Sequence, residues 1–452
     1  MNPQFLHNNT HLENVRTFAQ TDPHLKRLYT QKYQYQSPII NAFPRDQSAI
    51  VTLGGGRQIG KSTLLKQWMN DLLATGVNPS TICFYSGELI QDHQTLFHIL
   101  ETQLKTMPKN EMKYIILDEV TDIRDWDKTV KYLADIGLLD HVVLLLSGSD
   151  LSLMQEARKR FPGRRGHASQ VDFHYYPLSF AECLRLKKIP ATLKNLPNLY
   201  QALEQYLIHG GFLTAINDYA VHGRIANATF VIYSDWIRGD ILKREKKEYF
   251  LREIIEAIIK HYTKQVSWDN LTKELSIDHT QTITDYVGLL ASMDAVFVQA
   301  ALMEDKLKGA PKKRKKLMFC DPFIYHAMRA WIDPVENIYE KQVLPIFSQS
   351  VQYSELIEAC VVTHFRRFSP TYYIKAEGEV DVAYIHKKRF WPVEVKWTTQ
   401  LRPKDLKQVA KYKNAEIYAK SMENNILHNV PVIPLPLALA SIDQKFLDPL
   451  TP

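Results

Sequence analysis

The feature that most constrains this chain is a glycine-rich stretch that directly follows a short run of β-branched residues. Residues 49–53 have the composition of a buried parallel strand, and a helical pattern follows the glycines. Between them stands the spacing Gly55-x4-Gly60-Lys61-Ser62. In a strand, loop and helix context this spacing is the P-loop signature. We therefore predict a site that binds the phosphates of a nucleotide.

The positions of this loop have predicted roles in holding ATP. Glycines let successive backbone N–H groups and the helix N-terminus face the β-phosphate. We expect Lys61 to reach the β- and γ-phosphates, and the Ser62 hydroxyl to ligate Mg²⁺. The predicted nucleotide-binding residues are Gly55, Gly56, Arg57, Gln58, Ile59, Gly60, Lys61, Ser62 and Thr63.

A second apolar run, residues 114–117, ends in the carboxylates Asp118 and Glu119. It predicts a core strand with acids at its C-terminal edge. We expect Asp118 to hold Mg²⁺ through the water shell of the ion. Glu119 is placed to orient and activate the water that attacks the γ-phosphate. A strand end capped by solvated acids is the alternative.

Two further segments add candidate catalytic residues. Residues 141–146 predict a third strand, which leads into Ser147-Gly148-Ser149. A hydroxyl or amide of this segment could contact the γ-phosphate or the attacking water, and Ser149 is the candidate. Arg164 and Arg165 stand in a later glycine-rich loop, a suitable source of an arginine that acts on the nucleotide of a neighbouring subunit. We favour Arg164, which implies a homo-oligomer. A solvated loop is the alternative.

Together these segments resemble the AAA-type P-loop ATPases of the ASCE class that carry a C-terminal domain of unknown function, a mostly prokaryotic family. The matching segments are GGGRQIGKSTLLKQ, YIILDEV, LLLSGSD, GRR and YYPLSFAECL, and the match continues through Gly210-Gly211. The resemblance implies a parallel αβα sheet with an additional strand between the P-loop strand and the strand of Asp118. The commoner form GPRQVGKTT differs at Gly56 and Ser62, but neither change removes a needed atom.

With 452 residues the chain is too long for one hydrophobic core. We expect an α/β protein of four parts: a parallel αβα P-loop AAA-type ATPase domain (1–175), a helical lid (176–245), a winged helix-turn-helix (246–334) and an α/β nuclease-like domain (335–452). Four scattered cysteines without a CxxC pair indicate a reducing compartment. With no signal-like N-terminus and no apolar run of about 20 residues, we expect a cytoplasmic protein that does not contact a membrane.

The middle of the chain predicts a DNA-binding unit. Three helical patterns from residue 250 are followed by two extended runs, 295–302 and 317–320, which is the order of a winged helix. The connecting loop is strongly basic and carries Lys312, Lys313, Arg314, Lys315 and Lys316. Such a loop suits contacts to DNA phosphates, whose strength falls steeply with salt. A solvated loop or a protein-binding module is the alternative.

The last part has charged residues in a distinctive pattern. Residues 378–384 and 392–397 predict two strands, and Glu394 and Lys396 share one face, toward where Asp381 could lie. With Glu358 on a preceding helix, these residues resemble the PD-(D/E)xK nuclease fold. The resemblance implies that the acids bind Mg²⁺ and that the lysine polarises the attacking water or the scissile phosphate. Alternation of charged and apolar residues is also common on half-buried sheets, which is the alternative to a nuclease-like fold. A complete ligand set in a domain linked to an ATPase could equally bind DNA without cutting it.

These observations predict an Mg²⁺-dependent ATPase that binds DNA and couples ATP hydrolysis to remodelling or moving it. One alternative is a nucleotide-gated signalling or scaffold ATPase with protein partners. Another is a metal-dependent DNA nuclease of a defence system. Stimulation of ATP turnover by DNA would favour the first interpretation, and Mg²⁺-dependent cleavage that Lys396→Ala abolishes would favour the third.

Overall fold

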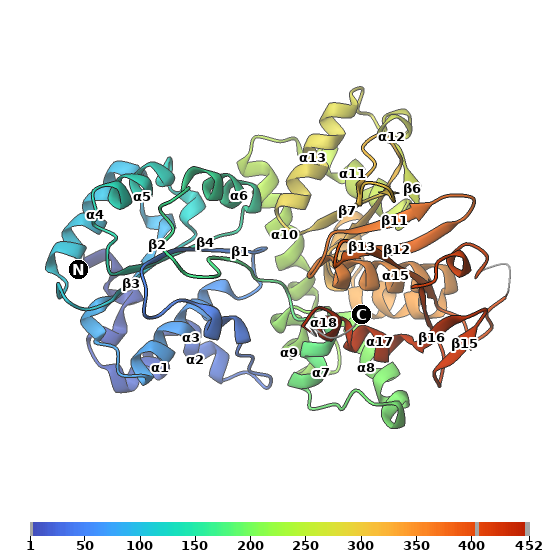
Figure 1. Ribbon diagram of the computed structural model, residues 1–452, viewed down its shortest axis with the longest axis horizontal. Helices are drawn as coiled ribbons and strands as arrows, with labels where there is room; N and C mark the ends of the chain where they lie inside the picture. The colour runs from blue at the N-terminus through green and yellow to red at the C-terminus, as the bar shows by residue number, and fades with distance from the viewer. Residues whose placement is uncertain (1–2, 403–405, 448–452) are drawn as a thin grey trace. The chain divides into compact units, whose positions relative to one another are not determined.

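A computed structural model of the chain describes residues 3–402 and 406–447. The chain forms two compact units, Met1–Tyr176 and Pro177–Pro452, called here the N-terminal and the C-terminal unit (Figure 1). In the described ranges, no helix has the length and apolar character needed to cross a bilayer.

The N-terminal unit is built on a five-stranded parallel sheet of order β2-β3-β4-β1-β5. The strands are β1 (Ala49–Gly54), β2 (Ile82–Ser86), β3 (Lys113–Asp118), β4 (Val142–Gly148) and β5 (Asp172–His174). β1, β3 and β4 are buried along their whole length, which explains why their sequences are continuous apolar runs. β4 lies between β1 and β3, so the additional strand that the family resemblance implies is present.

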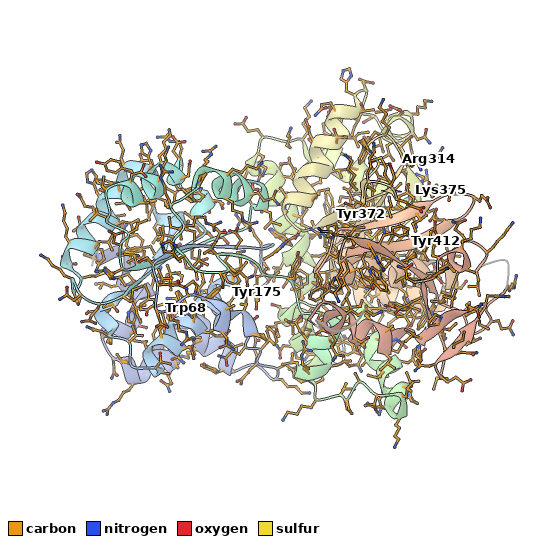
Figure 2. All side chains as sticks on the ribbon, in the orientation of Figure 1. Trp68, Tyr175, Arg314, Tyr372, Lys375 and Tyr412 are labelled. Carbon is orange, nitrogen blue, oxygen red and sulfur yellow. The ribbon has the colours of Figure 1, made fainter. Side chains whose placement is uncertain are left out.

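Helices cover both faces of this sheet (Figure 1). They are α1 (Phe18–Thr21), α2 (Pro23–Tyr29), α3 (Lys61–Ala74), α4 (His93–Thr106), α5 (Trp126–Asp135) and α6 (Leu151–Arg160). α4 and α5 bury apolar side chains against one face. On the side of α3, the fully buried ring of Trp68 (Figure 2) lies 5.3 Å from the ring of Phe43 and 5.9 Å from that of Tyr114, measured between centroids. Each face of the sheet thus has its own apolar layer.

The residues that precede β1 close the free edge of β2, the terminal strand of the sheet order. The side chain of Asn9 accepts a hydrogen bond from the Phe84 N–H and donates one to the Phe84 carbonyl, both at 2.8 Å. A ring nitrogen of His11 lies 3.1 Å from the Ile82 carbonyl oxygen. Side chains therefore satisfy backbone groups that an edge strand would otherwise leave unpaired.

The C-terminal unit begins with helices. They are α7 (Phe180–Leu186), α8 (Leu196–His209), α9 (Leu213–His222), α10 (Asn227–Lys243) and α14 (Pro322–Ile332). Gly210 and Gly211 separate α8 from α9, and the Gly211 N–H donates to the buried carboxylate of Asp321 at 2.8 Å. A Cβ on Gly210 would lie 1.7 Å from an Asp321 oxygen, which explains the glycine there. The predicted lid helices thus pack against other elements of this unit, and their action as a lid stays a prediction.

Between α10 and α14 lie three helices and a small antiparallel sheet of order β6-β10-β7. The elements are α11 (Glu248–Lys260), β6 (Gln265–Val266), α12 (Trp268–Glu274), α13 (Thr280–Ser292), β7 (Val296–Ala300) and β10 (Lys315–Phe319). The hairpin connection contains the short strands β8 (Leu302–Met303) and β9 (Lys308–Gly309). β10 begins at Lys315, two residues before the predicted extended run, so Lys315 and Lys316 belong to the strand rather than to the loop.

The last part of the chain forms a six-stranded mixed sheet of order β11-β12-β13-β14-β16-β15. Its strands are β11 (Thr371–Lys375), β12 (Glu379–His386), β13 (Arg389–Lys396), β14 (Glu416–Ala419), β15 (Asn425–Leu427) and β16 (Val430–Pro434). The helix α15 (Ser350–Arg366) packs against β11, β12 and β13. The helices α17 (Leu435–Ala440) and α18 (Ile442–Leu447) follow β16.

Candidate active site

The P-loop joins β1 to α3 and depends on glycine at two positions. A Cβ on Gly55 would lie 2.3 Å from the carbonyl oxygen of Tyr175, so the backbones approach too closely for a side chain. Gly60 precedes α3 with a φ of +94°, a conformation that L side chains rarely adopt. These two features let the loop turn tightly into the helix N-terminus, where backbone N–H groups can face an anion.

Lys61 is the buried cation of this loop, with 4% of its side chain exposed. Its ammonium donates to the carbonyl oxygens of Gly55 at 3.1 Å and Gly56 at 2.9 Å. It lies 3.6 Å from a carboxylate oxygen of Glu119. Lys61 therefore lies across the inside of the loop, close to the predicted catalytic carboxylate, where it can meet the phosphates of a nucleotide.

Asp118, at the end of β3, is held by two hydroxyl groups. Ser62 donates to its Oδ2 at 2.5 Å, and Ser147 donates to its Oδ1. Ser147 is fully buried, and its oxygen also accepts the backbone N–H of Glu119 at 3.2 Å. The two predicted Mg²⁺ ligands, Ser62 and Asp118, are thus in direct contact. Ser147, on the adjacent strand β4, supports both acids.

Glu119 follows β3 with a φ of +50°, in the left-handed region that non-glycine residues seldom occupy. Such backbone strain is found most often at functional sites. One oxygen of its carboxylate, Oε2, is buried and has no hydrogen-bond partner among the described residues. A buried acceptor without a donor is costly, so the geometry fits a residue that accepts a bond from a bound water. With the contact between Ser62 and Asp118, the donor set fits a nucleotide with Mg²⁺.

The other predicted nucleotide-binding residues belong to the same loop and to the first turn of α3. Gly56 and Ile59 are buried, Arg57 and Thr63 are half-buried, and Gln58 is exposed with a φ of +59°.

Ser149 and Arg164, the other catalytic candidates, have different surroundings. Ser149 is buried just beyond β4, while the hydroxyl that contacts Asp118 belongs to Ser147. Arg164 forms an ion pair with Asp135 on α5, and this pairing raises the pKa of the arginine. The neighbouring Arg165 donates to the Ile50 carbonyl at 3.2 Å within the unit, which is a structural contact. The catalytic roles of Ser149 and Arg164 stay predictions.

In the C-terminal unit, the four residues of the expected nuclease-like site come together from α15, β12 and β13. Lys396 forms an ion pair with Glu394 at 2.6 Å, and Asp381 accepts the Val395 N–H at 2.9 Å. Burial raises the pKa of Glu358 to about 7 and that of Glu394 to about 8. Glu358, Asp381 and Lys396 line a cavity of about 430 Å³. Throughout residues 3–402 and 406–447, however, no group of three His, Cys, Asp or Glu side chains has the arrangement needed to hold a metal ion.

The five basic residues expected to contact DNA do not share one surface. Lys312, Lys313 and Arg314 are exposed in the hairpin loop. Lys315 is half-buried and donates to three carbonyl oxygens of the loop, including that of Lys313 at 2.7 Å. Lys316 is only 1% exposed and is paired with carboxylates, because its side chain points inward from β10. Lys316 is therefore not placed for the expected surface contact.

Comparison with known proteins agrees with the geometry of the N-terminal unit. Residues 47–184 match the model of the AAA domain, and residues 200–334 match a domain of unknown function (DUF8612). An uncharacterised protein of Haemophilus influenzae is 25% identical over 291 residues, which cover 61% of this chain and 68% of that protein.

Two solved structures show a more distant likeness. A Walker-type ATPase of Pyrococcus abyssi is 13% identical with a TM-score of 0.40, over 62% of this chain and 90% of that one. The RuvB Holliday junction branch migration motor of Thermotoga maritima is 16% identical with a TM-score of 0.30, over 59% of this chain and 84% of that one.

The match to the AAA domain and the site around Lys61 define the class of this protein. The sheet carries a P-loop, a carboxylate pair at the end of the adjacent core strand, and an inserted strand between them. Residues 47–184 therefore form an AAA domain, and the protein is a P-loop ATP hydrolase.

Proposed function

We propose that this ATPase uses Mg²⁺ and binds DNA, and that it couples ATP hydrolysis to remodelling or moving the DNA. The observation that carries the proposal is an exposed basic hairpin loop on a helical unit in the same chain as the ATPase site. The ATPase activity supplies the free energy, and the basic loop supplies a contact to the phosphate backbone.

At the ATPase site, the residues have separate tasks. Ser62 and Asp118 would hold Mg²⁺, which when bound draws negative charge away from the phosphates. Lys61 and the backbone N–H groups of residues 55–63 bind the phosphate oxygens. Glu119 accepts a hydrogen bond from a water and orients it, because its Oε2 is buried without a partner among the described residues. Arg164 of a neighbouring copy would add a positive charge, which is why we propose a homo-oligomer.

The order of elements between α11 and β10 supports a winged helix. The order is helix, short strand, two helices and a hairpin, and β6 pairs with β10 as the third strand of the sheet. In DNA-binding members of this motif the last helix enters the major groove, while basic residues contact the backbone. We propose this arrangement for α13 and the hairpin loop.

The hairpin loop is held in place beside β11. The hydroxyl of Tyr373 donates to the Arg314 carbonyl at 2.7 Å, and the Lys313 ammonium lies 3.4 Å from the Lys375 carbonyl oxygen. Figure 2 labels Arg314 of this loop and Lys375 of β11. Lys375 is itself exposed, so it extends the basic surface of Lys312, Lys313 and Arg314. Because the loop is anchored, binding of phosphates loses less conformational entropy than it would on a free loop.

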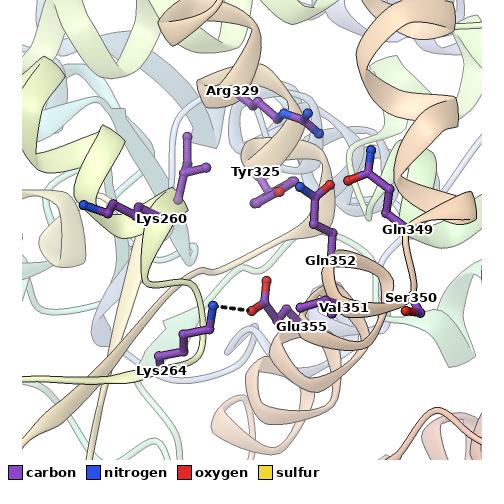
Figure 3. Close-up of a pocket in the computed structure, with 10 residues that line it drawn as sticks. Lys260, Lys264, Tyr325, Arg329, Gln349, Ser350, Val351, Gln352 and Glu355 are labelled. Carbon is purple, nitrogen blue, oxygen red and sulfur yellow. Dashed lines mark ion pairs between the residues drawn. The ribbon is translucent and has the colours of Figure 1, made fainter.

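A cavity of about 510 Å³ in the same unit offers a second place for phosphates (Figure 3). Among the described residues that line it, Lys260, Lys264 and Arg329 are cationic and Glu355 is acidic. Lys264 pairs with Glu355 at 3.0 Å, yet 57% of the lysine side chain is exposed, so a phosphate can compete for it. Lys260 is likewise paired, with Glu274 at 2.5 Å, and 65% of its side chain is exposed. A contact to nucleic acid at this concave site would therefore exchange exposed ion pairs for phosphate contacts.

The first test is the steady-state ATPase rate with no DNA and with single-stranded, duplex and four-way-branched DNA, at low and physiological salt. We expect one form to stimulate turnover, and more strongly at low salt. Glu119→Gln should bind ATP without hydrolysing it and serves as the blank. A rate that no DNA changes would favour the nucleotide-gated scaffold with protein partners instead.

The chain offers a matched pair of charge variants. Lys312, Lys313 and Arg314 are changed to Gln together. The control is the same change in the exposed triplet Lys387, Lys388 and Arg389, which comprises the β12–β13 turn and the first residue of β13. If all three loop cations contact duplex phosphates, the slope of log Kobs against log[salt] should weaken by about 2.7, since each contact contributes about 0.9. The control should keep the slope. If both triplet variants weakened the slope equally, DNA binding would depend only on the net charge of the protein. That result would contradict the proposed contact between DNA and the hairpin loop.

A further inference from the structure

Lys316 places a buried ammonium group inside the acidic cluster of the C-terminal unit. Its Nζ lies 2.5 Å from Glu379, 2.8 Å from Glu358 and 3.8 Å from Asp381. Only 2% of its side chain is exposed, and its pKa is raised because the three carboxylates outweigh the cost of burial. A lysine this deep in a protein stays charged only when acids surround it. Lys316 is therefore a fixed cation of the cluster.

The carboxylate oxygens of the cluster are largely committed to partners. Glu379 accepts from Gln265 as well as from Lys316, and Asp381 accepts the Val395 N–H at 2.9 Å with its second oxygen. Glu394 accepts from Lys396 with one oxygen and buries the other without a hydrogen-bond partner among the described residues. Divalent ions prefer several free carboxylate oxygens around one open point. Here the ammonium group of Lys316 lies among the carboxylates of Glu358, Glu379 and Asp381.

We propose that Lys316 takes the place of the divalent ion in the nuclease-like site, so that this domain does not cleave nucleic acid. The proposal concerns the cation of the cluster and does not depend on whether the hairpin loop binds DNA. It also gives the lysine a second task. Lys316 stands on β10, whereas its partners stand on α15 and β12, so the ion pairs fasten the hairpin to the mixed sheet.

The experiment is a titration of the nucleotide-free full-length protein with Mn²⁺, with free Mn²⁺ measured by electron paramagnetic resonance. The variants are Lys316→Met, which removes the ammonium, and Lys313→Met, which removes an exposed charge from the same hairpin. We expect Lys316→Met to bind one Mn²⁺ more per chain than the wild type. Lys313→Met should match the wild type, which also controls for any Mn²⁺ held at Asp118.

A second measurement keeps the proposal testable if Lys316→Met does not fold. The wild type and Asp381→Asn should bind Mn²⁺ equally, and neither should cleave supercoiled or single-stranded DNA with Mg²⁺ or Mn²⁺. Loss of a Mn²⁺ site in Asp381→Asn, or wild-type cleavage that Glu394→Gln abolishes, would overturn the proposal. So would a folded Lys316→Met protein with no additional site. Stimulation of the ATPase by DNA is measured separately, so its failure would leave this result unchanged.

Discussion

The hydroxyl of Ser147 offers the sharpest test of how the ATPase site is held together. Ser147→Ala removes the donor to Asp118 Oδ1 and the acceptor for the Glu119 N–H, both in the interior of the N-terminal unit. Asp118 keeps its bond from Ser62 at 2.5 Å, so one charge-assisted hydrogen bond is lost rather than two. Such a bond contributes about 1.5–3 kcal/mol. If the alignment of Asp118 and Glu119 matters in the transition state, kcat should fall about 10- to 160-fold.

The assay is steady-state ATP hydrolysis by Ser147→Ala, with Ser149→Ala as the matched control two residues along the chain. The dissociation constant of a fluorescent ATP analogue reports nucleotide binding. We expect Ser147→Ala to lower kcat while binding changes by less than about threefold, because Lys61 and the loop backbone are intact. We expect Ser149→Ala to retain most of the wild-type kcat, since the contact to Asp118 belongs to Ser147.

The opposite ranking would refute this reasoning. If Ser149→Ala lost activity and Ser147→Ala kept it, the hydroxyl that acts during turnover would be Ser149, as the sequence first suggested. If both variants lost nucleotide binding, the serines would support the fold of the loop rather than the alignment of the two acids.

Two further predictions concern the edge of β2. Asn9→Ala leaves the N–H and the carbonyl of Phe84 without their side-chain partners. This loss should destabilise the N-terminal unit by about 2–4 kcal/mol, measured as a lower thermal unfolding temperature. Asn8→Ala is the neighbouring control. Burial lowers the pKa of His11 to about 4, below its ordinary value of 6.5, so the unfolded chain binds the additional proton. Stability should therefore fall by up to about 3 kcal/mol as pH decreases from 6.5 to 4, seen as lost hydrogen-exchange protection of β2. His11→Gln should flatten this dependence, and equal loss in the variant would show that His11 is not responsible.

The nucleotide site could be predicted from the sequence because its residues are adjacent in the chain or follow core strands. Residues 55–63 form one loop, and the carboxylates come directly after a buried apolar run. Buried parallel strands are apolar along their length, so β1, β3 and β4 could be predicted from the single sequence. The position of β4 between β1 and β3 was predicted from the family resemblance, because the residues alone do not indicate the order of the strands.

The contacts that define the rest of the site depend on register, which composition does not reveal. β4 extends through Gly148, and this extension places Ser147 rather than Ser149 beside Asp118. β10 begins at Lys315, so the side chain of Lys316 points inward. The sequence pattern places Lys316 in the hairpin loop and therefore predicts an exposed side chain. A shift of one residue along a strand reverses the face of a side chain, which is why Lys316 was assigned to the wrong environment.

The closed edge of β2 also limits how copies of this protein can associate. An open edge strand can extend its sheet into a second molecule, and such pairing is a common route to aggregation. Here Asn9 and His11 occupy the backbone groups of Phe84 and Ile82 that a second strand would need. An oligomer that brings Arg164 to a neighbouring nucleotide is therefore not expected to pair strands at the edge of β2. A shortened chain that lacks these first residues would leave that edge open to pairing with another molecule.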